Sequence, residues 1–359
     1  MSYKDKRAQH HSAAGRYPDI PDLPDLPAID WGLIGHQAPQ LLDTPPEKMP
    51  EADVVVITWA AAEWAAMQHV FIQSDQAMPY SDSTHGGWSG WQKYDLDMPP
   101  EKGSEDWDYW GYYRLVEING KKVLLFKSNT HLDWPGEKYL ADLIYRINRY
   151  VKPQLILSIG TAGGCRLGDH IGAVNVVNAG TMYDSEQPAK DWPTYRSQYS
   201  PAWDIINGSD FNRLLFTIPA TTANLTLLKD QFNAKYGTDY ALAELNVDDL
   251  DLPVGLPVLS NLTTSNTSLL TAATFVVGTT SGEYADYAVI EMDDAVIGRV
   301  CEAEGVAFGF VRNVSDPAQN AALPTETQES WGSAVYDVFG FYTSYNGALV
   351  TWALLAAMD

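Results

Sequence analysis

Short runs of β-branched residues alternate along this chain with segments of helical composition, and this alternation limits the folds available to it. VVVIT at 54–58 passes into an Ala-rich stretch, LILSI at 155–159 follows a helical pattern at 137–151, and a strand-like run near 307–314 follows another helical pattern. Strands that alternate with helices are typical of α/β proteins. The sequence therefore predicts an α/β fold with buried strands.

Two further elements are predicted outside this alternation. Asn119 and Gly120 stand between two strand-like runs, and this dipeptide is a strong signal for a two-residue β-hairpin turn. The apolar stretch at 331–358 predicts a final pair of helices.

The chain divides into a short leading segment and one large domain. Residues 1–50 are rich in Pro and Asp, and each proline fixes its own φ and favours extended geometry before it. Apolar residues in this arm could dock on its own domain or on a neighbour, with disorder as the alternative: Ile20, Leu23, Leu26, Ile29 and Trp31. Residues 51–359 are predicted to form a single domain with inserted loops near 80–110 and 185–250.

Charge and composition argue against several classes of protein. The chain has 359 residues with 23 Lys and Arg against 46 Asp and Glu, a formal net charge of −23 that repels nucleic acids. The longest apolar run, at 348–358, is shorter than the roughly 20 residues of a membrane span, and no secretory signal is recognisable. Two distant cysteines, Cys165 and Cys301, fit a reducing cytoplasm.

Four positions that directly follow predicted strands hold polar residues or glycines, and ligands of α/β sheets bind beyond the carboxyl ends of strands. These positions are 58–63, 160–164, 291–294 and 313–316. Each has a common structural explanation when taken alone, because acidic residues favour helix starts and Gly-rich segments favour turns. GTAGG at 160–164 also lacks the spacing of a dinucleotide-binding or phosphate-binding loop.

Taken in order, these segments resemble the purine nucleoside phosphorylase and nucleosidase superfamily, above all its methylthioadenosine/S-adenosylhomocysteine nucleosidase branch. The resemblance covers roughly 54–316 and is carried by ITWAAAEW at 57–64, by SIGTAGG at 158–164 with LGD at 167–169, and by VIEMD at 289–293 with RNVSD at 312–316. It implies a phosphorylase/hydrolase-like, three-layer α/β/α fold with a mixed central sheet, and an enzyme that breaks N-glycosidic bonds.

The resemblance also implies roles for individual residues. Asp316 is expected as the acid beside N7 of a purine, and Glu63 as the base that activates the attacking water. Base and sugar contacts are expected from Thr161, Ala162, Gly163, Met292, Asp293 and Ser315. The chemistry fits these residue types, since such a reaction needs one protonated and one ionised carboxyl. No cofactor is implied, and the histidines lack metal-ligand spacing.

The choice between water and phosphate as nucleophile depends on basic residues. The loop from Ala60 to Glu63 has none and carries a carboxylate, which favours hydrolysis. A phosphate-dependent phosphorylase and a non-catalytic nucleoside-binding protein remain alternatives. The expected substrate is a purine nucleoside or nucleotide, and candidate phosphate contacts are Lys93, Arg114, His131, Arg166 and Arg312. The family resemblance further implies a homo-oligomer, either a dimer or a hexamer.

Overall fold

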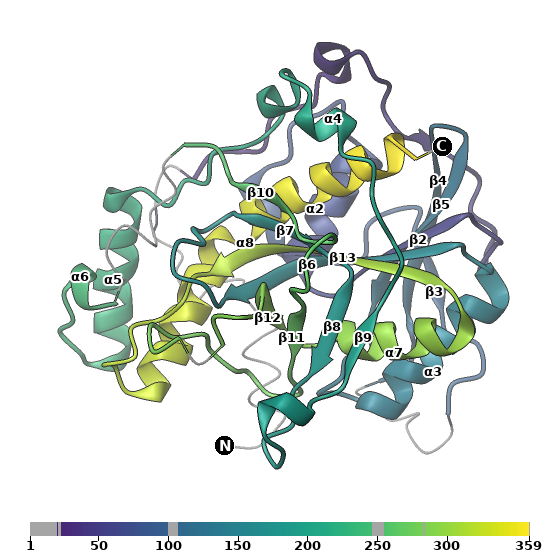
Figure 1. The fold of residues 1–359 in the computed structure, drawn as a ribbon. Coiled ribbons are helices and arrows are strands. Elements are labelled where there is room, and N and C mark those ends of the chain that lie inside the picture. Colours follow the sequence, from purple (N-terminus) through teal and green to yellow (C-terminus); the bar gives the residue numbers. More distant parts are fainter. Residues whose placement is uncertain (1–19, 21–22, 100–106, 246–254, 283, 359) are drawn as a thin grey trace.

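The computed structural model describes residues 20, 23–99, 107–245, 255–282 and 284–358, which form three layers with a sheet in the middle (Figure 1). The strands are β1 Gln40–Leu41, β2 Val54–Thr58, β3 Gln92–Tyr94, β4 Gly111–Ile118, β5 Lys121–Ser128, β6 Leu155–Gly164, β7 Val174–Val177, β8 Ala179–Met182, β9 Thr194–Arg196, β10 Leu259–Asn261, β11 Leu269–Thr271, β12 Val289–Glu291 and β13 Ala307–Asp316. The α-helices are α2 Ala61–Phe71, α3 Glu137–Val151, α4 Asp204–Asn207, α5 Thr222–Tyr236, α6 Leu242–Leu245, α7 Asp294–Glu304 and α8 Thr325–Ala356. Short 3-10 helices are η1 Trp31–Ile34, η2 Tyr80–Thr84, η3 Ala189–Asp191 and η4 Phe211–Arg213.

The sheet is mixed, as expected. Its main path runs β1-β4-β5-β2-β6-β12-β11-β8-β9, and β13 pairs with both β6 and β7. At its centre β2 runs parallel to β5 and β6, and β6 runs parallel to β13, whereas β12 is antiparallel to β6. The carboxyl ends of β2, β6 and β13 therefore lie at one edge of the sheet, which confirms the predicted α/β class.

Helices cover both faces of the sheet, with α2 and α8 on one face and α3 and α7 on the other (Figure 1). All residues of β2 are buried, and they alternate between two hydrophobic cores as a strand period of two requires. Val54 and Val56 pack toward α2 and α8, whereas Val55 and Ile57 pack toward α3 and α7. The β-branched run that predicted this strand is thus buried on both sides.

The C-terminal region corrects one prediction, because it forms the single 32-residue helix α8 and not a pair of helices. Gly347 lies inside it, and glycine is a weak helix former. A Cβ at Gly347 would lie 2.6 Å from Asn313 Oδ1, so glycine permits α8 to approach β13 closely. Packing of α8 against α2 and β13 then stabilises a helix that local propensity alone would interrupt.

The predicted hairpin is confirmed. Asn119 and Gly120 join β4 to β5, and both have positive φ, 50° and 76°. The Asn119 side chain also donates to the carbonyl of Ala356 at 3.1 Å, which ties the hairpin to the end of α8.

The described part of the N-terminal segment packs on its own chain. Leu26, Ile29 and Trp31 are buried. Leu26 exchanges backbone hydrogen bonds of 2.9 Å with Met78, and the ring of Trp31 lies 4.2 Å from that of Trp352 in α8. Residues 1–19 and 21–22 of the predicted arm lie outside the described residues. None of the described helices combines the length and the apolar character that crossing a membrane requires.

A β-bulge near the end of β13 decides which way its last side chain points. Val314 pairs with Ala162 of β6, but the next paired residues are Asp316 and Gly163, so Ser315 is an extra residue on β13. Paired residues share a face of the sheet. Val314 and Ala162 both pack toward α3 and α7, and the bulge turns Asp316 to the opposite face, beneath α8.

Candidate active site

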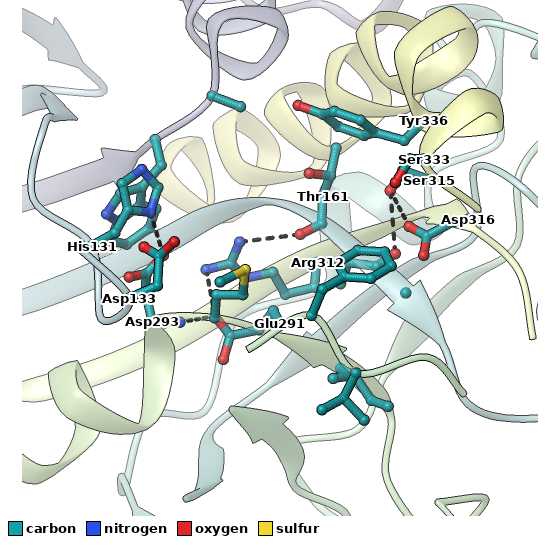
Figure 2. Close-up of a pocket in the computed structure, with 18 of the residues that line it drawn as sticks. His131, Asp133, Thr161, Glu291, Asp293, Arg312, Ser315, Asp316, Ser333 and Tyr336 are labelled. Carbon is teal, nitrogen blue, oxygen red and sulfur yellow. Dashed lines mark hydrogen bonds and ion pairs between the residues drawn. The ribbon is translucent and has the colours of Figure 1, made fainter. Parts of the chain in front are cut away.

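The four segments that follow predicted strands meet in one pocket at the carboxyl ends of β2, β6 and β13 (Figure 2). His131, Asp133 and Asp293 lie at one end of it, Ser315, Asp316 and Ser333 lie at the other, and Thr161, Arg312 and Tyr336 lie between them. The lining residues are Trp59, Ala60, Glu63, His131, Asp133, Thr161, Ala162, Gly163, Thr274, Phe275, Val276, Ile290, Glu291, Met292, Asp293, Arg312, Ser315, Asp316, Ser333 and Tyr336.

Glu63 is buried in the first turn of α2 and is held by five hydrogen bonds. Its Oε2 accepts from Thr58 Oγ1 at 2.7 Å and from the backbone N–H groups of Trp59 and Ala60 at 3.0 and 2.8 Å. Its Oε1 accepts from the N–H and the hydroxyl of Thr161, both at 2.8 Å. Burial alone would favour the neutral acid, but the charge of Arg312 and these donors hold the pKa of Glu63 below its ordinary value. Glu63 is therefore ionised at neutral pH.

Glycine at position 160 lets Glu63 and Arg312 approach the same point above β6. A Cβ at Gly160 would lie 2.5 Å from Glu63 Oε1 and 2.8 Å from Arg312 Nη1. Any side chain there would overlap both groups. Because Gly160 has no side chain, a position above the strand stays open, and the Glu63 carboxylate and the Arg312 guanidinium both face it.

Arg312 is buried beneath the pocket against Glu291 at the end of β12 and Asp294 at the start of α7. Its Nε and Nη2 donate to Asp294 at 2.7 and 2.5 Å, Nη2 also donates to Ser158 Oγ at 2.8 Å, and Glu291 Oε2 lies 3.3 Å away. Burial disfavours the charge of Arg312, but Asp294 and Glu291 outweigh this effect and raise its pKa. Burial and the charge of Asp294 in turn raise the pKa of Glu291 above its ordinary value.

Asp316 is buried at the opposite end of the pocket from Asp293 (Figure 2), and burial raises its pKa to about 7. Ser315 Oγ donates to Asp316 Oδ1 at 2.7 Å. With the Ser315 hydroxyl donating to Oδ1, the proton of the neutral acid would be on Oδ2. Oδ2 lies 3.0 Å from where a Cβ on Gly163 would be and 3.5 Å from where one on Gly332 would be. The two glycines leave the acidic oxygen accessible from the pocket.

Asp293, expected to hold ribose hydroxyls, lies in the pocket but already has partners within the chain. Its Oδ1 accepts from the backbone N–H of Leu132 at 2.9 Å, and its Oδ2 lies 3.2 Å from His131 Nδ1. A carboxylate can accept further hydrogen bonds, so a sugar would share Asp293 with the loop after β5. Met292 lies beside it in the pocket wall.

The candidate phosphate contacts separate into two groups. His131 and Arg312 line the pocket, whereas Lys93, Arg114 and Arg166 do not. Lys93 is an exposed residue paired with Asp108 at 3.2 Å. Arg114 donates to the carbonyl of Ser89 at 2.7 Å, and Arg166 donates to Asp169 and Asn175. Sequence spacing could not show that these three cations lie on other parts of the surface.

The two inserted loops do not form the pocket where they are described. Residues 80–99, 107–110 and 185–245 contribute none of its lining. Other residues, which the sequence did not single out, do line it: Asp133, Thr274, Phe275, Val276, Ser333 and Tyr336. No motif marks them, because aromatic and hydroxyl side chains are common in cores and on helices. Only the folded chain brings α8 and the loop after β11 over β6.

No family model matches the chain, and no curated protein sequence shows a significant match. Similar solved structures include the 5′-methylthioadenosine/S-adenosylhomocysteine nucleosidase of Neisseria meningitidis in complex with methylthio-immucillin-A, with a TM-score of 0.48 and 13% identity over 85% of this chain and 99% of that one. The S-adenosylhomocysteine nucleosidase of Streptococcus pyogenes has a TM-score of 0.48 and 12% identity over 87% of this chain and 99% of that one. The futalosine hydrolase of Helicobacter pylori has a TM-score of 0.44 and 13% identity over 84% of this chain and 96% of that one.

Proposed function

We propose that this protein hydrolyses the N-glycosidic bond of a purine nucleoside or nucleotide, releasing the free base and ribose or ribose phosphate. The observation that carries the proposal is the pair of buried carboxyls in one pocket whose surroundings move their pKa values apart: the pKa of Glu63 is lowered, and that of Asp316 is raised to about 7. Such a pair supplies a proton to a leaving group and receives one from a nucleophile at the same pH.

The two carboxyls face different parts of the pocket. Glu63 accepts from Thr161 of β6, whereas Asp316 lies against Gly163, two residues further along the strand. A nucleoside bound over β6 can therefore meet the acid at its base and the ionised carboxylate at its sugar.

The reaction follows from these positions. The bond between C1′ and the base nitrogen breaks, its electron pair goes to the purine, and Asp316 Oδ2 gives its proton to N7. A water held above Gly160, within reach of Glu63 Oε1 and Arg312 Nη1, adds its oxygen to C1′ and passes a proton to Glu63. Asp293 and Met292 border the sugar, and Phe275 offers a ring against which a base can stack.

The surroundings of Arg312 support water over inorganic phosphate as the nucleophile. Arg312 is the one lysine or arginine among the described lining residues, and its guanidinium is bonded to Asp294 and faced by Glu291. A phosphate ion in the pocket would gain little from an arginine already neutralised by carboxylates and would be repelled by Glu63.

The test is release of free base from adenosine, inosine, guanosine, methylthioadenosine, AMP and ATP, each with and without inorganic phosphate, followed by chromatography. Release without phosphate, lost in Asp316→Asn, is the expected result. Release only with phosphate would make the protein a phosphorylase. Binding of a nucleoside without release would make it a nucleoside-binding protein.

A further inference from the structure

Trp59, the residue after β2, contacts both groups that flank the position above Gly160. Its backbone N–H donates to Glu63 Oε2 at 3.0 Å. The guanidinium carbon of Arg312 lies over its indole ring, 5.5 Å from the ring centroid. The side chain of Trp59 is 3% exposed and lines the pocket. One residue therefore joins the carboxylate and the guanidinium between which the proposed reaction holds its water.

The indole reaches Arg312 because of its place along the strand. Side chains of a strand alternate between the two faces of the sheet, and Trp59, like Ile57, packs in the core toward α3 and α7. Arg312 bonds with Asp294 of α7 on this same side. The indole Nε1 donates to the carbonyl of Thr130 at 2.9 Å, which fixes the ring against the loop after β5.

The guanidinium of Arg312 keeps one hydrogen that no other described residue accepts. A guanidinium has five N–H hydrogens. Nε donates to Asp294, Nη2 donates to Asp294 and Ser158, and Nη1 donates to the carbonyl of Thr161 at 3.4 Å (Figure 2). The second hydrogen of Nη1 remains, and Nη1 lies 2.8 Å from where a Cβ on Gly160 would be. Because the guanidinium is planar and rigid, its tilt decides where this hydrogen points.

We propose that Trp59 is a positioning residue for the proposed hydrolysis, one whose indole ring holds the guanidinium of Arg312 with Nη1 directed at the water above Gly160. A cation is attracted to the face of a Trp ring most strongly where both are removed from water, and the side chain of Arg312 is only 3% exposed. The backbone bond from Trp59 to Glu63 does not depend on the side chain, so a substitution of the indole acts through Arg312. This inference rests on the proposed function.

The experiment measures kcat and KM separately by base release in the full-length protein, with the aromatic ring at position 59 removed or kept. Trp59→Leu is expected to lower kcat about tenfold, the scale of a cation–π contact removed from water, while KM stays within about threefold. Trp59→Phe keeps an aromatic face but lacks Nε1, and its kcat should stay within about threefold of the wild type. Trp59→Met fills the space without a ring and takes the place of Trp59→Leu if that variant does not fold.

The pH dependence of kcat gives a second readout that a merely structural role would not change. The acid limb of this profile reports the ionisation of Glu63. Against the effect of burial, the charge of Arg312 lowers the pKa of Glu63. A guanidinium that turns away from Gly160 lowers it less, so the acid limb should move to higher pH in Trp59→Leu, by about half a pH unit, and stay in place in Trp59→Phe.

Trp107→Leu is the matched control. Trp107 is a fully buried tryptophan of the same core, donates Nε1 to Thr130 Oγ1 at 3.2 Å, and is not part of the pocket lining. Loss of this indole should lower the thermal midpoint of unfolding and leave kcat and the acid limb unchanged. An equal loss of kcat in Trp107→Leu and Trp59→Leu would assign the effect to the loop after β5 and overturn the inference.

Three other results would overturn it. These are a normal kcat in Trp59→Leu, a loss of kcat in Trp59→Phe as large as in Trp59→Leu, and a rise in KM with kcat unchanged, which would make the indole a substrate contact. Base release by the wild-type protein separates this inference from the proposed function. A wild-type protein that releases no base overturns both, whereas wild-type release with any of the three results overturns the role of Trp59 alone.

Discussion

Asp316→Asn should make the protein more stable at pH 8 and much less active, two effects of opposite sign from one substitution. The pKa of Asp316 is raised by burial from 3.8 to about 7. Between these values the folded state holds a proton that the unfolded state has released, so the free energy of unfolding falls as pH rises and the loss is complete above about 7. At about 1.4 kcal/mol for each pH unit, the difference amounts to about 4 kcal/mol. The amide of Asn resembles the protonated acid and has no charge to bury.

The measurement is denaturant unfolding of the wild type and of Asp316→Asn at pH 4 and pH 8. The free energy of unfolding of Asp316→Asn, relative to that of the wild type, should increase by about 4 kcal/mol from pH 4 to pH 8. The contributions of all other carboxyls cancel in this difference because both proteins contain them. Base release should fall by about 10²-fold or more, as for a lost general acid. An advantage that is the same at both pH values would show that Asp316 titrates like an exposed carboxyl, and such a group could not protonate a leaving base at neutral pH.

Three further predictions concern the same pocket. Glu63→Gln should lower kcat by about 10²-fold or more with KM within about threefold, measured by base release, and a normal kcat would remove Glu63 from the mechanism. The value of kcat/KM should fall about tenfold for each pH unit above about 7, where Asp316 loses its proton; a profile flat to pH 9 would contradict this assignment. A β-nucleoside should yield the α-anomer of the sugar first, observable by NMR within minutes, because water in the proposed reaction attacks C1′ from the face opposite the leaving base; initial β-anomer would indicate a covalent intermediate instead.

Local signals predicted much of the fold. The β-branched run of β2 is buried on both faces, and Asn119 with Gly120 forms the hairpin turn, because both patterns depend on neighbours in the sequence. Gly340 and Gly347 are weak helix formers, so the sequence predicts two helices where the structure has the single helix α8. What compensates at Gly347, the close approach of α8 to Asn313 of β13, is a tertiary contact that the sequence does not show.

The candidate site was likewise predictable from the sequence only in part. The motifs that follow strands brought Glu63 and Asp316 together, since strand ends in a parallel sheet share an edge. The sequence did not reveal that Asp293 is also bound by the loop after β5, or that Arg312 is neutralised by Asp294. Those contacts join segments more than 150 positions apart or depend on exact side-chain direction, and charge alone does not predict them.

The bulge at Ser315 has a consequence for how this site tolerates change. Consecutive side chains of a regular strand point to opposite faces of the sheet, but the bulge lets the neighbours Ser315 and Asp316 both line the pocket, where the Ser315 hydroxyl donates to Asp316 Oδ1. Deleting Ser315 would restore regular pairing and leave the acid opposite Gly163 on the same face of the sheet, but without this donor. Within a lineage of such proteins, the presence of the extra residue and its hydroxyl are therefore constrained together.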